Sequence, residues 1–233
     1  MDTWHLLAVP RSACVLVTFV KCREVSVTCQ RISTVYTDQV MATEFLIHDS
    51  YSAPAQGDLE LLQRFTNLHV HWPDQAGTDP PTEVIRDFLV ERELLSKNER
   101  FTEKDRETFL ELRDAIRGLI KSNEGEPIAA RDAETIDRIG LAAGLHPHFH
   151  AAHAPTLEPE GRGVVAAFGA VVAIAFVSAF DGSFEHLKLC ADQTCRAVFY
   201  DRSKNHTGRW CSMSTCGNRA KVRAWRERQR IED

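Results

Sequence analysis

Four cysteines near the C-terminus have the residue type and the spacing of a metal site. They form two pairs, Cys190-x4-Cys195 and Cys211-x4-Cys216, separated by fifteen residues. Two short pairs joined by a turn-rich segment can supply four thiolates to one tetrahedral zinc ion. Because four protein ligands leave no position for water, the spacing predicts one structural Zn²⁺ rather than a catalytic one. His186 and His206 lie close enough in the sequence to replace one cysteine.

The cysteine pairs lie in the basic segment of an otherwise acidic chain. Residues 186–230 contain 11 basic and 3 acidic residues, a net charge of +8. Residues 1–185 contain 17 basic and 28 acidic residues, a net charge of -11, and the final two carboxylates complete the total of -5. This division predicts two functional parts, and a cationic surface on a metal-built module favours nucleic-acid binding.

A helix at about Asn218–Arg230 is expected to follow the last cysteine, with Asn218 as its N-cap. Four arginines in it recur at helical spacing and form the arginine stripe: Arg219, Arg223, Arg226 and Arg230. We expect the stripe to meet phosphates or a guanine edge, while Val222 and Trp225 pack against the cysteines from another face. A solvated basic helix that only keeps the module soluble is the simpler alternative. Further candidates for DNA contacts are Arg202, Lys204, Arg209 and Lys221.

Residues 186–230 resemble the CGNR zinc finger in five short motifs. These are Leu189-Cys190, Cys195-Arg196, Phe199-Tyr200-Asp201-Arg202-Ser203, Arg209-Trp210-Cys211-Ser212-Met213 and Cys216-Gly217-Asn218-Arg219-Ala220-Lys221. In that family the finger follows a helical domain called ABATE, described as a stress-induced transcription regulator. Residues 57–180 resemble this domain in Phe65-Thr66-Asn67 and in Leu112-Arg113-Asp114-Ala115-Ile116-Arg117. The resemblance implies DNA binding by the finger. One departure is Gly208, which stands where many members carry a second arginine.

The expected fold is mainly α with a short β element: a helical body, then a small zinc-ribbon-like module that ends in a helix. Residues 1–40 are interpreted as a poorly ordered extension whose start site is assigned too early. Residues 41–182 are interpreted as an ABATE-like regulatory domain, and residues 186–230 as the CGNR finger. Apolar periodicity and capping residues predict helices at about 58–70, 82–95, 102–124, 132–143 and 164–180, with Thr82 and Thr102 as the N-caps of the second and third. A loop is predicted at 73–81, and strands at 187–190 and 197–200.

The stretch Val164–Phe180 is 17 residues without a charge. A membrane-spanning helix needs about 20 such residues, so we interpret it as the central helix of the body. The first 30 residues lack the order of a secretion signal, and seven cysteines do not make an even disulfide framework. We therefore expect no membrane association and a cytoplasmic location, at the nucleoid if the protein binds DNA.

A second group of metal-ligating residues, His146, His148, His150 and His153, lies in the body. The first three alternate and would share one face of a strand, where they could bind zinc with an open position, as in a hydrolase. Their neighbours in the sequence include no carboxylate to orient the rings, so we expect an exposed histidine-rich loop. The chain has no motif of a catalytic nucleophile or a phosphate-binding loop, and we expect no enzymatic activity.

These patterns predict a zinc-dependent, DNA-binding transcriptional regulator whose body senses a signal and regulates the finger. The target sequence, the effector ligand and the formation of a homodimer are left open. An acidic body could also dock on its own basic module and mask it. Two alternatives remain: an adaptor whose basic finger binds an acidic protein surface, and a metal-dependent hydrolase that uses the His146–His153 tract.

Overall fold

The computed structural model describes residues 54–68, 70–72, 75–152 and 154–232. The expected extension at residues 1–40, with its hypothesis of a misassigned start, lies outside the described residues.

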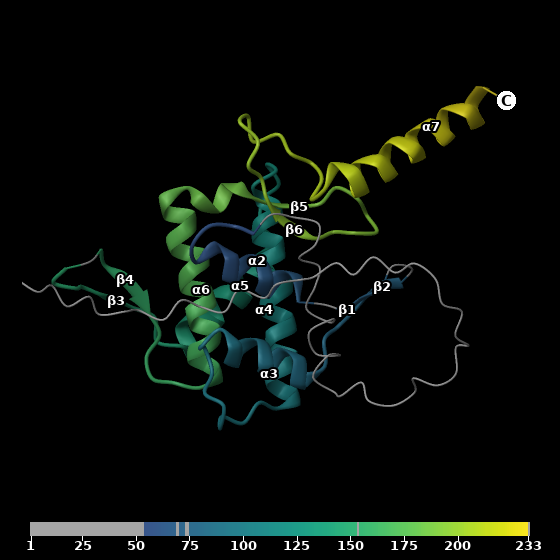
Figure 1. Ribbon diagram of the computed structural model, residues 1–233. Helices are drawn as coiled ribbons and strands as arrows, with labels where there is room; N and C mark the ends of the chain where they lie inside the picture. Colours follow the sequence, from purple (N-terminus) through teal and green to yellow (C-terminus); the bar gives the residue numbers. More distant parts are fainter. Residues whose placement is uncertain (1–53, 69, 73–74, 153, 233) are drawn as a thin grey trace, which may run out of the picture. The chain divides into compact units, whose positions relative to one another are not determined.

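The body is helical, as predicted (Figure 1). Its helices are α2 (Leu59–Asn67), α3 (Thr82–Glu91), α4 (Glu103–Ser122), α5 (Ala130–Ala142) and α6 (Val164–Asp181). Each begins and ends within a few residues of the range that apolar periodicity predicts. The fold class is therefore mainly α, with strands only in short antiparallel pairs in the part of the chain described here.

Helix α4 shows why these segments become helical. Thr102 and Asp105 form a capping box: the Asp105 backbone N–H donates to Thr102 Oγ1 at 3.3 Å, and the Thr102 N–H donates to Asp105 Oδ2 at 2.7 Å. These bonds satisfy two amides that the first helical turn leaves unpaired. One face of the helix is fully buried, through Phe109, Leu112, Ile116 and Ile120. The same face joins the body's main apolar core.

Helix α6 packs against α2, α4 and α5 and supplies Phe168 and Val171 to the core. A Cβ atom on Gly169 would lie 2.3 Å from the Ala143 Cβ, so glycine is what lets α5 and α6 approach closely. By length and composition α6 could also cross a membrane, but half of its 18-residue window is buried in the protein. Core helices of soluble proteins pass the same test. Gly182, with φ of 82°, ends the helix.

Among the described residues, six short strands form three antiparallel pairs. These are β1 (Val70–Trp72) with β2 (Gln75–Thr78), β3 (His146–His148) with β4 (Thr156–Glu158), and β5 (Leu187–Leu189) with β6 (Val198–Tyr200). The β5–β6 pair confirms the predicted strands. The predicted loop at 73–81 is partly wrong, because residues 75–78 form β2. Residues 73 and 74 lie outside the described residues. The turn-forming residues of this stretch hid the strand that accompanies them in the sequence.

Two predicted helix caps are also wrong. The N-cap of α3 is Pro81, and Thr82 is already helical, its hydroxyl donating to Glu103 Oε2 at 2.8 Å. At the C-terminus, a π-helical turn (Met213–Gly217) runs directly into α7 (Asn218–Glu232). Ser212 therefore caps this segment by accepting from the Thr215 N–H at 3.3 Å, and Asn218 has helical dihedral angles.

The β5–β6 hairpin is built into the body. Leu187 and Val198 are fully buried in the same core as the body helices. On α2, the Asn67 side chain donates to Val198 O at 2.7 Å and accepts from Val198 N at 2.8 Å, as a neighbouring strand would. Arg117 of α4 donates to Thr66 O at 2.8 Å and also to Arg196 O. The body thus holds one side of the C-terminal module in place.

Burial lowers the pKa of the Arg117 guanidinium to about 10, so this side chain remains charged near neutral pH. Asn67 and Arg117 both belong to the short motifs that carry the ABATE resemblance. In the structure these motifs form the junction with the C-terminal module. Their side chains satisfy backbone groups that would otherwise be left unpaired where the two parts meet.

Candidate metal centre and basic helix

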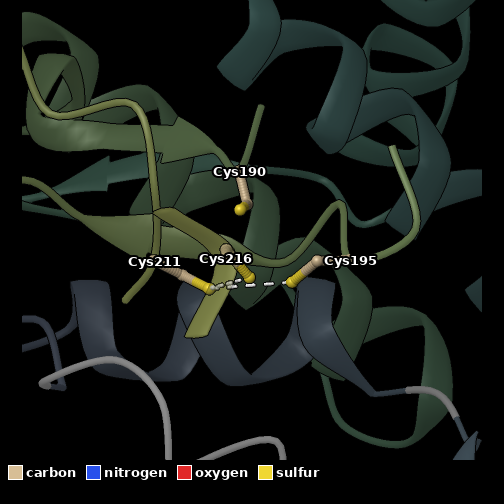
Figure 2. Close-up of side chains that lie close together, drawn as sticks. All are labelled: Cys190, Cys195, Cys211 and Cys216. Carbon is tan, nitrogen blue, oxygen red and sulfur yellow. Dashed lines mark hydrogen bonds between the residues drawn. The ribbon is translucent and has the colours of Figure 1, made fainter. Parts of the chain in front are cut away.

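The four C-terminal cysteines, called the cysteine cluster from here on, come together from two turns of the module. Figure 2 shows the four sulfur atoms directed toward a common centre. All four lie within 4.8 Å of one another, and Cys211 Sγ is 3.6 Å from both Cys195 Sγ and Cys216 Sγ. Three of the cysteines are buried and Cys211 is partly buried. All four are free thiols, since a disulfide would bring two sulfurs to about 2.05 Å.

The arrangement fits a tetrahedral zinc ion. Zinc–sulfur bonds of about 2.3 Å place tetrahedral thiolates about 3.8 Å apart, close to the observed separations. The thiols' mutual hydrogen bonds lower the pKa of Cys190 and raise those of Cys195 and Cys211. Four thiolates at these separations repel one another, and a divalent cation stabilises them together. Four protein ligands make this one structural zinc site.

His186 and His206 do not join the cysteine cluster. Their Nδ1 atoms lie 3.0 Å apart, and their rings are tilted by 59° with centroids 4.3 Å apart. His186 also packs against Tyr200 at 5.2 Å. The substitution of a histidine for one cysteine ligand, which the sequence left open, is therefore not what the geometry favours.

Asp192, inside the first cysteine turn, fixes the start of α7. Its carboxylate is fully buried and accepts from Arg219 Nε at 2.9 Å and from Arg223 Nη2 at 3.0 Å. It also accepts from the Thr194 N–H and hydroxyl. Arg219 Nη2 in addition donates to Cys216 Sγ at 3.1 Å. The proximal half of the arginine stripe thus joins α7 to the cysteine cluster.

Apart from the contacts of Arg219 and Arg223 with Asp192, α7 is exposed to solvent. Every residue from Lys221 to Ile231 is exposed. The expectation that Val222 and Trp225 pack against the cysteines is wrong, because these side chains are 46% and 56% exposed. The side chains that pack around the cysteine cluster are instead Ala197, Phe199 and Trp210. The described residues leave the exposed length of α7 uncovered, so they give no support to masking by the acidic body.

The remaining DNA-contact candidates fall into two groups. Arg202 donates to Pro54 O and lies over the Tyr200 ring, so it packs on the body, and Arg209 lies over the Trp210 ring. Lys204 lies in a loop, and Lys221, Arg226 and Arg230 lie on α7. All six of these side chains, Arg202 and Arg209 included, are exposed. Arg230 has a weak contact with Glu227 at 3.9 Å. Sequence reasoning missed Arg228, which is equally exposed but lies off the stripe.

A buried ion pair supports the β5–β6 side of the module. Lys188 Nζ donates to Asp201 Oδ2 at 2.9 Å, and the Asp201 side chain is only 3% exposed. Burial alone would raise the pKa of Asp201, but hydrogen bonds from Lys188, Ser203 and Gly208 outweigh it and hold the pKa well below its usual range. A Cβ atom on Gly208 would lie 2.6 Å from Asp201 Oδ1. Glycine at this departure from the family pattern leaves room for the carboxylate.

The histidine tract is only partly assembled. His148 and His150 meet each other and Glu158 of β4, whereas His146 Nδ1 is bonded to Gly144 O, and His153 lies outside the described residues. The expectation of a loop without a neighbouring carboxylate is wrong. The carboxylate comes from the paired strand, eight to ten residues away in the sequence, which local composition does not reveal.

Comparison with known families agrees with both halves of this architecture. The model of the ABATE family, described as "Putative stress-induced transcription regulator", matches residues 60–182. The chain belongs to the ABATE family. The model of the CGNR zinc finger matches residues 186–229, directly after the ABATE region. None of the curated proteins matches the chain. The two families are those of a transcription regulator and of a metal-binding finger, and neither is a family of enzymes.

Proposed function

We propose that this ABATE protein is a zinc-dependent, DNA-binding transcriptional regulator in which α7 contacts DNA. The observation that carries the proposal is the contrast along α7. Arg219 and Arg223 bind the helix to Asp192 beside the cysteine cluster. Every residue from Lys221 to Ile231 is exposed, and Lys221, Arg226, Arg228 and Arg230 in this stretch make no contact with Asp192 in the described structure. An exposed cationic helix held at a defined place by a rigid support is suited to meeting DNA phosphates.

The arginines of the stripe have two different proposed roles, which depend on whether they contact Asp192. Arg219 and Arg223 use part of their donors on the buried carboxylate, so their first role is to orient the helix. Arg226 and Arg230 continue the same face beyond the anchor. They are therefore the stripe residues that we expect to contribute most to DNA affinity without supporting the module.

The experiment separates these roles. The double variant Arg226→Glu, Arg230→Glu reverses two exposed charges and leaves the Asp192 contacts intact. Each lost phosphate contact weakens the counterion-release term, so affinity of the zinc-loaded protein for duplex DNA should fall at least tenfold at moderate salt. The matched control is Lys97→Glu, Arg100→Glu, the same charge change on exposed body residues. Equal affinity of the double variant and this control would count against the proposal.

A protein-interaction adaptor is the second candidate, and the exposure of Val222 and Trp225 on α7 favours it. Aromatic side chains with neighbouring arginines are typical of protein interfaces. Capture of partners with the zinc-loaded protein, with and without nuclease, distinguishes the two functions. Partners that depend on intact nucleic acid support DNA binding, whereas partners that survive nuclease and are lost in Trp225→Ala support the adaptor.

The regulatory role of the body also belongs to the proposal. The junction through Asn67, Arg117 and the buried hairpin gives a rigid connection by which a change in the body could reposition α7. The body region 41–182 would then bind the effector, and residues 186–230 would read the DNA. We propose a cytoplasmic location, at the nucleoid when the protein is bound to DNA.

A further inference from the structure

The β3–β4 hairpin places three potential metal ligands on one face. Its register pairs His146 with Glu158 and His148 with Thr156. Because residues directly opposite each other point to the same face and side chains alternate along a strand, His148 and Glu158 share that face. His150, two residues beyond His148, reaches the same group.

The distances show that these side chains already converge. His148 Nδ1 lies 3.0 Å from Glu158 Oε2, and His150 Nε2 lies 3.5 Å from Glu158 Oε1. The two imidazole rings are 4.4 Å apart between centroids. One donor atom from each of the three residues lies within 4.8 Å of the others. We call His148, His150 and Glu158 the histidine–glutamate cluster.

Ligand geometry favours a metal ion at this place. Zinc binds imidazole nitrogen and carboxylate oxygen at about 2.0–2.2 Å, so its ligand atoms lie about 3–3.5 Å from one another. The observed separations need little adjustment to reach those values. Two nitrogens and one oxygen form a harder donor set than four thiolates, and they suit zinc, cobalt or nickel.

Neighbouring side chains also orient the Glu158 carboxylate. The Thr156 hydroxyl donates to Glu158 Oε1 at 2.6 Å, and it lies 2.8 Å from His150 Nε2. Hydrogen bonds from Thr156 and His148 lower the pKa of Glu158, which is therefore ionised at neutral pH. An oriented, charged carboxylate between two imidazoles is the usual surrounding of a bound divalent cation.

We propose that His148, His150 and Glu158 form a second metal site, which takes a borderline divalent cation such as Zn²⁺ and leaves positions open to water or another ligand. This site is independent of the cysteine cluster and of DNA binding. The bound ion would cross-link the two strands of the hairpin. The hairpin's far strand packs on α6, and the Glu160 N–H that follows it donates to Ala143 O at 2.8 Å. The ion would therefore stiffen the connection between α5 and α6.

The test counts metal ions on the full chain whose cysteine cluster is already loaded with zinc. Equilibrium dialysis against free Zn²⁺ buffered in the micromolar range should give two ions per chain for the wild type. It should give one for His148→Ala and one for the isosteric Glu158→Gln. His146→Ala is the matched control, because its ring is bonded to Gly144 O, and it should keep two ions.

Cobalt identifies the ligands of the second ion. The first Co²⁺ should show sulfur-to-metal charge transfer from the cysteine cluster. A second Co²⁺ should add absorption without more charge transfer, because its ligands are nitrogen and oxygen. One ion per chain in the wild type, or two ions in both His148→Ala and Glu158→Gln, would overturn the proposal. Circular dichroism confirms that each variant is folded before its metal content is compared.

Discussion

The two sides of the cysteine cluster differ in what surrounds them. On one side, the β5–β6 hairpin is buried in the core of the body and bonded to Asn67 of α2. On the other side, α7 is held by Asp192 through Arg219 and Arg223, and its residues from Lys221 to Ile231 are exposed. The difference indicates that the cysteine cluster connects a buried hairpin to an exposed helix. We expect the β5–β6 hairpin to contribute to the stability of the protein, and we propose that α7 recognises DNA.

The largest effect on structure should come from removing one zinc ligand of the cysteine cluster. In Cys211→Ser the zinc loses one of four ligands, and zinc binding contributes about 10–16 kcal/mol in small finger modules. We expect zinc to be lost and α7 to lose its fixed position, while the helical body, which has its own core, remains folded. Metal analysis and NMR spectra of zinc-loaded protein measure both. Lys204→Ala, an exposed change in the same module, is the control and should retain the zinc ion of the cysteine cluster. Full zinc content in Cys211→Ser would show that the cysteine cluster is not the site.

The next largest effect should fall on the hairpin side. Asp201→Asn leaves the buried charge of Lys188 unpaired, which costs about 3–5 kcal/mol when a buried ion pair is broken. The pKa of Asp201 is lower in the folded protein than in the unfolded chain. Its contribution to the free energy of unfolding is therefore complete above the unfolded pKa of about 3.9, and it is lost as the pH falls toward the folded pKa. Urea denaturation at a series of acidic pH values measures this. The free energy of unfolding of the wild type should decrease below about pH 4 as Asp201 is protonated. Asp201→Asn has no carboxylate there, so its free energy of unfolding should lack this decrease. Equal acid profiles for the two proteins would contradict the assignment.

A smaller effect should mark the junction with the body. Asn67→Ala removes two hydrogen bonds to Val198. Gln63 Nε2 still lies 3.4 Å from Val198 O, but the Val198 N–H loses its Asn67 acceptor, at a cost of about 1–3 kcal/mol. Asn67→Asp is the informative companion, because it removes the donor to Val198 O and places a second acceptor there. Both variants should lower the free energy of unfolding in urea. Unchanged stability in both would mean that the hairpin is held by its apolar contacts alone.

The smallest effect on stability should come from the exposed end of α7. Arg226→Gln removes a charge from a solvated surface, and such changes usually stay within about 0.5 kcal/mol. Thermal denaturation should therefore not distinguish this variant from the wild type, although its DNA affinity should be lower. A clear loss of stability would show that Arg226 has a structural partner. It would then contradict the contrast between the buried β5–β6 hairpin and the exposed end of α7.

Local patterns in the sequence predicted those features whose partners are near in the chain. The paired spacing of Cys190, Cys195, Cys211 and Cys216 and the N-cap at Thr102 are of this kind. Asp192 was missed because its partners, Arg219 and Arg223, lie 27 and 31 residues away. Glu158 was missed because only the register of β3 and β4 places it beside His148. Val222 and Trp225 were misplaced because an apolar side chain indicates where burial is favourable and does not show whether a partner is present.

The salt dependence of DNA binding tests the central claim most directly. If about six cations of the C-terminal module meet phosphates, the logarithm of the association constant should fall with the logarithm of salt concentration at a slope near -5. The Arg226→Glu, Arg230→Glu variant should reduce that slope by about 2 units, because two phosphate contacts are lost. Affinity of the zinc-loaded protein that does not change with salt, or an identical slope in the variant, would contradict the account.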